Sequence, residues 1–201
     1  GKGSKTWTSV VDTDFPPEYS ATGTVSADFS IPYDWELMQN SYPVLQSPPT
    51  ASELAVARLI FDLGVAFESQ FGTFEIGTAT YTDKPVPALE TYFGYSGLIQ
   101  EESRPQATLF QHIKEDVLAG YPVRASTPDQ EYGPGQSLFE PGHAFVVSGL
   151  AQEGGADYYF LNYGWGGHHS GWYRLNDGYD VGDKGTVIDS AITHFLPAKQ
   201  A

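Results

Sequence analysis

Residues 142–147 read GHAFVV and residues 161–167 read LNYGWGG, and these two stretches decide the fold of the chain. The first places His143 at the start of an apolar run, which is typical of a strand. The second ends the next apolar run, residues 157–163, which follows a turn at Gly154-Gly155. Two such runs joined by a short turn pair as an antiparallel hairpin. The pattern therefore predicts that the ring of His143 and the amide of Asn162 come together.

The flanking sequence predicts helices before the hairpin and further strands after it. Thr50 and Glu53 have the spacing of a capping box. Apolar residues then recur at helical spacing and predict one buried stripe, formed by Val56, Ile60, Leu63 and Phe67. A second helix is expected over 106–119, with a buried stripe of Leu109, Ile113 and Val117. Strands are expected over 123–126, 171–175 and 186–196. The fold class predicted is α+β, with helices followed by a twisted antiparallel sheet, in a single domain over residues 1–201.

Composition excludes several classes of function. The chain has 201 residues and a net charge of −15, a balance that repels nucleic acid and anionic membranes. It contains no run of about 18 apolar residues, as a membrane-spanning helix requires. It also contains no cysteine, so disulfides, thiolate metal sites and thiol catalysis from within the chain are excluded.

The histidine and asparagine segments have the chemistry that thiol peptidases need. An imidazole takes the proton of the cysteine, and a side-chain amide holds its other ring N–H and so fixes the tautomer. A tryptophan beside the amide, here Trp165, shields that hydrogen bond from water. Alone, His143 is more simply a polar strand end, and the Gly-rich turn a packed corner. Taken together, in this order and one hairpin apart, the two segments favour the catalytic and the structural interpretation equally.

A family resemblance extends this interpretation over nearly the whole chain, from residue 1 to about 195. The segments GHAFVV and LNYGWGG, with GWYRL at 171–175, resemble the histidine and asparagine segments of the streptopain family of papain-like cysteine peptidases. The resemblance continues upstream, in LIFDLGVA at 59–66, YFGY at 92–95 and YDW at 33–35. It implies a papain-like fold, endopeptidase activity on proteins or peptides, and secretion from a bacterium as a zymogen. It also implies that no cofactor and no metal are needed.

The resemblance assigns roles to three residues. His143 is the expected general base and acid, Asn162 its orienting partner, and Trp165 the packing residue of the motif. Tyr163 stands where the family often has tryptophan, so the packing around the amide is expected to differ. The chain lacks the family's nucleophilic cysteine, whose helix is expected on a segment preceding residue 1 or on a separate chain. The expected partner is therefore the cysteine-bearing N-terminal fragment of the same precursor, and the chain alone is expected to be inactive.

Other readings remain open at this point. Without a cysteine, the chain also fits a non-catalytic pseudopeptidase that binds peptides on the same scaffold. His168 and His169 follow the Trp165 motif without a third metal ligand, and a contact with substrate is left open. Three aspartates, Asp177, Asp180 and Asp183, are interpreted as turn residues rather than a calcium loop. The long loop at 127–142 is expected to border the cleft as a lid.

Overall fold

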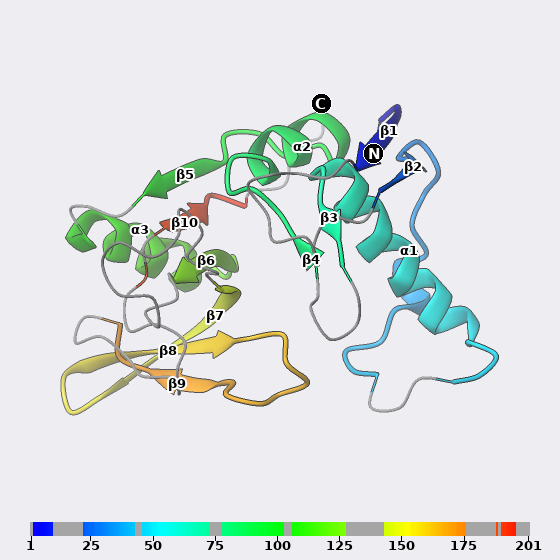
Figure 1. Ribbon diagram of the computed structural model, residues 1–201. Coiled ribbons are helices and arrows are strands. Elements are labelled where there is room, and N and C mark those ends of the chain that lie inside the picture. The colour runs from blue at the N-terminus through cyan, green and yellow to red at the C-terminus, as the bar shows by residue number, and fades with distance from the viewer. Residues whose placement is uncertain are drawn as a thin grey trace. The chain divides into compact units, whose positions relative to one another are not determined.

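A computed structural model describes the chain over residues 2–9, 22–42, 46–72, 78–102, 106–127, 143–175, 188 and 190–195 (Figure 1). The chain divides into two compact units, residues 1–95 and residues 96–201, and each is described by itself. The single domain predicted over 1–201 stays a prediction. The aspartates of the possible calcium loop, and residues 128–142 of the expected lid, lie outside the described residues.

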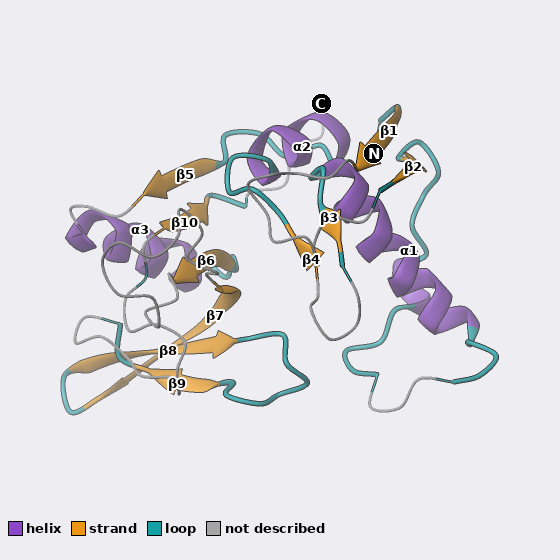
Figure 2. Ribbon diagram, viewed as in Figure 1, coloured by secondary structure: helices purple, strands orange, loops and turns teal. Residues whose placement is uncertain are grey.

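The first unit combines short antiparallel ribbons with two α-helices (Figure 2). Its elements are β1 (Ser4–Ser9), β2 (Gly23–Asp28), the 3-10 helix η2 (Trp35–Leu37), α1 (Ala51–Ala66), β3 (Gln70–Phe71), β4 (Thr78–Ala79) and α2 (Pro85–Tyr92). β1 pairs with β2, and β3 pairs with β4. Phe29, fully buried, stacks on Tyr92 with ring centroids 4.5 Å apart and forms a small core with Val65 and Ala66 of α1.

The start of α1 is the capping box that the sequence predicted. The Thr50 hydroxyl accepts a hydrogen bond from the Glu53 main-chain N–H at 3.2 Å. The Glu53 carboxylate accepts in return from the Thr50 N–H at 2.7 Å and from the Gln46 N–H at 2.6 Å. These bonds, that of Thr50 first, hold the pKa of the Glu53 carboxyl below its ordinary value.

The buried face of α1 is not the one that the apolar spacing predicted. Ile60 is 63% exposed, and the buried residues of the helix are Glu53, Asp62, Val65 and Ala66. Asp62 is buried because it accepts a hydrogen bond from the Tyr33 hydroxyl at 2.9 Å. The predicted stripe was wrong at Ile60 because two carboxylates, with hydrogen-bond donors outside the helix, occupy the inward positions.

The second unit is built around one antiparallel sheet (Figure 1). Its elements are β5 (Ile99–Glu102), α3 (Gln106–Leu118), β6 (Val123–Thr127), β7 (His143–Glu153), β8 (Ala156–Asn162), β9 (Gly171–Tyr173) and β10 (Ser190–Thr193). Within the described residues the strand order is β5-β10-β6-β7-β8-β9. The hairpin predicted around Gly154-Gly155 is the β7–β8 pair, which runs from Val146 opposite Asn162 to Glu153 opposite Ala156 and shifts its register between Val147 and Gly149.

Apolar side chains from α3 and from alternate strand positions fill the core of this unit. Leu109 and Ile113 of α3, both from the predicted stripe, are 2% and 0% exposed. They pack against a larger buried set comprising Val123, Ala125, Phe145, Val147, Tyr159, Leu161, Tyr163, Leu175, Ile188 and Ala191. The α+β class, with helices and an antiparallel sheet, is confirmed.

Candidate active site

His143 is the first residue of β7 and lies in register with Thr127 of β6. The residues at the next alternate positions, Phe145 and Val147, are 3% and 0% exposed. Because alternate side chains of a strand share one face of the sheet, His143 projects from the same face as these two core residues. Its own side chain is half-buried. The imidazole therefore lies at the end of an apolar row, where the core meets solvent.

The imidazole is held by a main-chain carbonyl. Its Nε2 lies 2.8 Å from the carbonyl oxygen of Tyr163. A carbonyl oxygen can only accept a hydrogen bond, so Nε2 must carry the proton and donate it. In the neutral ring the lone pair is then on Nδ1. This contact selects the tautomer in which Nδ1 is the atom able to take up a proton.

Two aromatic rings pack against the same imidazole. The Trp165 ring centroid lies 4.2 Å from that of His143, with the planes tilted by 36°. The Tyr163 ring lies parallel to the imidazole within 2°, at 5.6 Å, and is 1% exposed. Aromatic pairs of this kind contribute about 0.5–1.5 kcal/mol each beyond the area that they bury. The rings limit the orientations open to His143 and shield its hydrogen bond to Tyr163, which strengthens that bond.

Asn162 is the last residue of β8 and holds the turn that follows. It is in register with Val146, three positions after His143, so strand alternation directs its side chain to the opposite face of the sheet. The Asn162 side chain is exposed, and its Oδ1 accepts a hydrogen bond from the Gly164 N–H at 2.9 Å. The structure thus brings His143 and Trp165 together, and the oxygen that meets Nε2 belongs to Tyr163, one residue beyond Asn162.

Sequence reasoning missed the Tyr163 carbonyl because a main-chain acceptor has no residue signature. Strand alternation alone points the other way. Counted from Gly154-Gly155 without interruption, Asn162 would pair with Val147 and share the face of His143. A register shift between Val147 and Gly149 instead places Asn162 opposite Val146, and the turn residues carry no signal for that shift. The catalytic roles of His143, Asn162 and Trp165 stay predictions.

The segment between β8 and β9 is fixed by several hydrogen bonds. The His168 N–H donates to the Trp165 carbonyl at 3.1 Å, and the Ser170 N–H donates to the Gly167 carbonyl at 3.2 Å. Gly167 has a φ of 90°, in the left-handed region that glycine adopts without strain. These contacts define a compact turn directly after the ring of Trp165.

His169 occupies an unusual position in this turn. Its φ is 59°, a left-handed conformation that is uncommon for a residue other than glycine. Its carbonyl accepts a hydrogen bond from the Tyr173 hydroxyl at 2.6 Å. Its ring meets that of Trp165 edge-on, with centroids 5.7 Å apart and planes at 85°. Trp165 therefore lies in contact with two imidazoles, those of His143 and His169.

The described residues include no group of three His, Cys, Asp or Glu side chains arranged to hold a metal ion. In that same part of the chain, no helix combines the length and apolarity needed to cross a bilayer.

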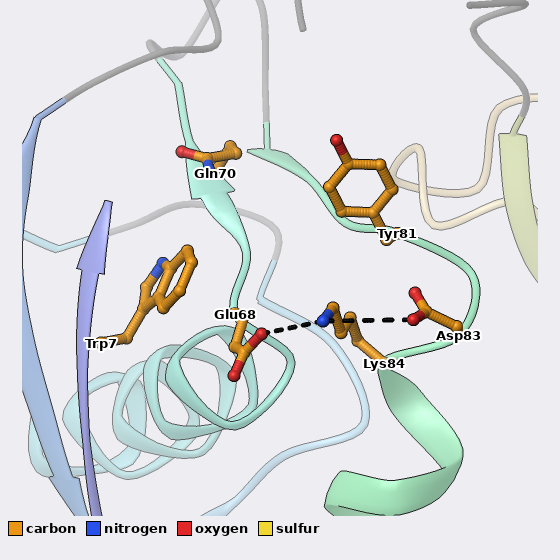
Figure 3. Close-up of a pocket in the computed structure, with 6 residues that line it drawn as sticks. All are labelled: Trp7, Glu68, Gln70, Tyr81, Asp83 and Lys84. Atoms are coloured by element: carbon orange, nitrogen blue, oxygen red, sulfur yellow. Dashed lines mark ion pairs between the residues drawn. The ribbon is translucent and has the colours of Figure 1, made fainter. Parts of the chain in front are cut away.

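A separate pocket of about 270 Å³ lies within the first unit (Figure 3). Its lining residues are Trp7, Glu68, Gln70, Tyr81, Asp83 and Lys84. The Glu68 carboxylate lies 3.0 Å from Lys84 Nζ and 2.9 Å from Lys5 Nζ. The hydrogen bond from Lys5, followed by that from Lys84, lowers the pKa of Glu68. Asp83 lies 4.0 Å from Lys84 Nζ, so two carboxylates face two lysines and these four charges balance.

Comparison with known proteins places these features in a family. The profile of the Peptidase C10 family matches residues 1–173. Streptopain of Streptococcus pyogenes is 26% identical over 175 residues, a match that covers 87% of this chain and 41% of that protein. The streptopains of its serotype M3 and M18 strains match to the same extent. The chain thus spans less than half the length of these relatives.

Solved structures agree with this family and with the fold. The active wild-type interpain A cysteine protease of Prevotella intermedia is 25% identical, with a TM-score of 0.77, over 97% of this chain and 74% of that one. A prointerpain A fragment from the same organism is 24% identical, with a TM-score of 0.72, and shows the fold alone. The match covers more than half of the chain, so the chain belongs to the Peptidase C10 family, whose members are cysteine-type endopeptidases.

Proposed function

We propose that this chain is the histidine-bearing part of a cysteine endopeptidase, with the nucleophilic cysteine supplied by polypeptide outside residues 1–201. Membership of the Peptidase C10 family supports the reaction class. The single observation that carries the role of His143 is the 2.8 Å contact between its Nε2 and the Tyr163 carbonyl. With the proton of the neutral ring on Nε2, Nδ1 is the ring nitrogen that can accept a proton from a nucleophile. The absence of cysteine from the chain requires that the thiol come from elsewhere.

The proposed reaction follows from this tautomer. Nδ1 of His143 takes the proton of the cysteine thiol, giving a thiolate and an imidazolium. The thiolate attacks the carbonyl carbon of the scissile peptide, and the carbonyl oxygen takes the negative charge. As the C–N bond breaks, the imidazolium gives its proton to the leaving amine, and a thioester remains. Water then hydrolyses the thioester, with His143 again acting as base, and the free thiol is restored.

Neighbouring residues have supporting roles in this proposal. Nε2 of His143 keeps its proton throughout, and the Tyr163 carbonyl stabilises the imidazolium by accepting from it. Trp165 limits the tilt of the ring and excludes water from it. Asn162 orients the imidazole indirectly, because its side chain caps the Gly164 N–H and so fixes the peptide whose carbonyl meets Nε2. Asn162 is thus a positioning residue in this proposal.

The proposed partners are protein or peptide substrates and the cysteine-bearing fragment of the same precursor. Streptopain and interpain A extend beyond the region that this chain matches, which supports a partner fragment of this kind. We further propose secretion from a bacterium as a zymogen, as the family resemblance implies. The net charge of −15 is compatible with an extracellular setting.

The test combines this chain with the cysteine-bearing polypeptide and measures hydrolysis of an unstructured protein. We expect hydrolysis that thiol-alkylating reagents abolish and that His143→Gln lowers by several orders of magnitude. The matched control is His112→Gln on α3, which should retain activity. Turnover in His143→Gln close to that of the parent protein would remove His143 from the mechanism.

A non-catalytic pseudopeptidase is the second candidate, and the absence of cysteine is the observation that favours it. Such a protein would bind peptides on the same scaffold without cutting them. The two candidates differ in what precedes residue 1 in the gene. A cysteine-bearing helix encoded there supports the peptidase, whereas a precursor without any cysteine in that region, together with peptide binding and no hydrolysis, establishes the pseudopeptidase.

A further inference from the structure

We propose that His169 selects an acidic side chain on the leaving-group side of the scissile bond. This inference rests on the proposed function, because it takes His143 as the proton donor to the leaving amine. Donation requires the amine nitrogen to lie within about 3 Å of Nδ1. The substrate residues that follow the scissile bond therefore begin beside the His143 ring.

Ring contacts lead from His143 to His169. Trp165 lies 4.2 Å from His143, and His169 lies 5.7 Å from Trp165, measured between ring centroids. The sum of those distances is the greatest separation possible between the two imidazoles. An extended peptide rises about 3.3 Å per residue, so His169 is within reach of the second or third residue after the scissile bond.

The backbone holds His169 where a substrate side chain can reach it. The hydrogen bond from Tyr173 to its carbonyl, at 2.6 Å, anchors the peptide unit, and the His169 ring meets Trp165 edge-on. The His169 side chain is nevertheless exposed. A strained, anchored and exposed residue beside an active site is a pattern that functional positions show more often than structural ones.

Charge chemistry defines the ligand class. Residues 158–173 contain no Asp, Glu, Lys or Arg, so His168 and His169 are the sources of positive charge in this segment. Imidazoles gain their charge between about pH 8 and pH 5. The chain as a whole carries a net charge of −15 and disfavours a carboxylate at long range. A preference for an acidic residue therefore requires a local cation. Of His168 and His169, we assign this role to His169, whose ring contacts Trp165.

The test compares two peptides in the assembled peptidase at pH 6. They carry Glu or Gln at one position after the scissile bond, and that position is moved through the first three residues. We expect kcat/KM to be higher for the Glu peptide by about two- to fivefold, the size of an exposed ion pair, at the second or third position. His169→Asn, which tolerates the left-handed backbone, should remove the preference, so that the Glu and Gln peptides have equal kcat/KM.

Two further variants sharpen the result. His169→Lys keeps a positive charge and should retain the preference. His168→Asn, the matched neighbour, should leave the preference in place. Equal cleavage of both peptides by the parent protein, or a Glu preference that survives in His169→Asn, would overturn the inference while leaving the proposed function intact. Failure of the assembled parent protein to cleave either peptide would instead count against the proposed function.

Discussion

The helix α1 and the β7–β8 hairpin are built on opposite principles. In α1 two carboxylates, Glu53 and Asp62, face inward, while Ile60 is 63% exposed. In the hairpin the inward positions are apolar or aromatic, and Leu161 and Tyr163 are 0% and 1% exposed. The helix is fixed by specific hydrogen bonds to its carboxylates and the hairpin by packing. The difference shows that the region bearing His143 is the one whose geometry is set by a dense aromatic core.

Tyr163→Ala should give the largest loss of stability. The substitution removes a fully buried ring that contacts His143, Phe145 and Trp165. We expect the free energy of unfolding of the assembled protein to fall by about 3–5 kcal/mol in denaturant titrations, as for other buried aromatic residues. Tyr163→Phe, which keeps the ring, should cost less than about 1.5 kcal/mol. Equal losses in the two variants would show that packing does not hold the hairpin.

Asn162→Ala should lower activity less than His143→Gln does. The amide takes no proton in the proposed reaction, but it caps the turn that positions the Tyr163 carbonyl. A displacement of that carbonyl by a fraction of an ångström should reduce kcat by about 10- to 100-fold. Asn162→Asp keeps an acceptor for the Gly164 N–H and should recover most of the loss. Parent-like kcat in the alanine variant would show that the turn holds its shape without the cap.

Glu53→Gln should remove a pH-dependent contribution to the stability of α1. The hydrogen bond from the Thr50 N–H, with those from the Thr50 hydroxyl and Gln46, holds the pKa of Glu53 below its ordinary value. The carboxylate therefore stabilises the fold fully above its unfolded pKa, near 4.3, and loses that contribution as pH falls through the lower folded value. We expect the variant to be less stable than the parent at pH 7 and the difference to shrink below about pH 4. A difference that is constant with pH would contradict this account.

Ile60→Ser should have the smallest effect. The side chain is mostly exposed, so little apolar surface returns to water when it is removed. We expect a change in the free energy of unfolding within about 0.5 kcal/mol, the range of ordinary surface substitutions. The buried counterpart on the second helix is Ile113→Ser, which should be strongly destabilising. Thermal unfolding of the two variants side by side would reveal any hidden packing role for Ile60.

Local patterns predicted much of the fold because covalent geometry enforces them. The apolar run that begins at His143 predicted the strand β7, and the capping box placed the start of α1 at Thr50. The stripe of α3 was also predicted, and its Leu109 and Ile113 are buried although Asp116 of the same helix is buried too. The predicted stripe of α1 was wrong at Ile60, because apolar spacing carries no information on hydrogen-bond donors outside the helix. Tyr33 and Gln46 are such donors, and they make burial of Asp62 and Glu53 favourable.

The sequence predicted which residues gather at the site more closely than it predicted the contacts between them. His143 and Trp165 are in contact, as their spacing across the hairpin suggested. The group that meets Nε2 was beyond the reach of sequence motifs, because every residue carries the same carbonyl. The left-handed turn at His169 was likewise unpredicted, since its hydrogen bond from Tyr173 depends on the return of β9.

The central claim is that His143 activates a cysteine outside this chain, and the pH dependence of alkylation tests it most directly. The rate of modification of the single most reactive cysteine in the assembled protein is measured with iodoacetamide from pH 4 to pH 10. Pairing with His143 predicts a thiolate that reacts below about pH 7.5, and His143→Gln should move the midpoint toward the ordinary thiol value near 8.5. The same midpoint in both proteins, close to 8.5, would contradict the account.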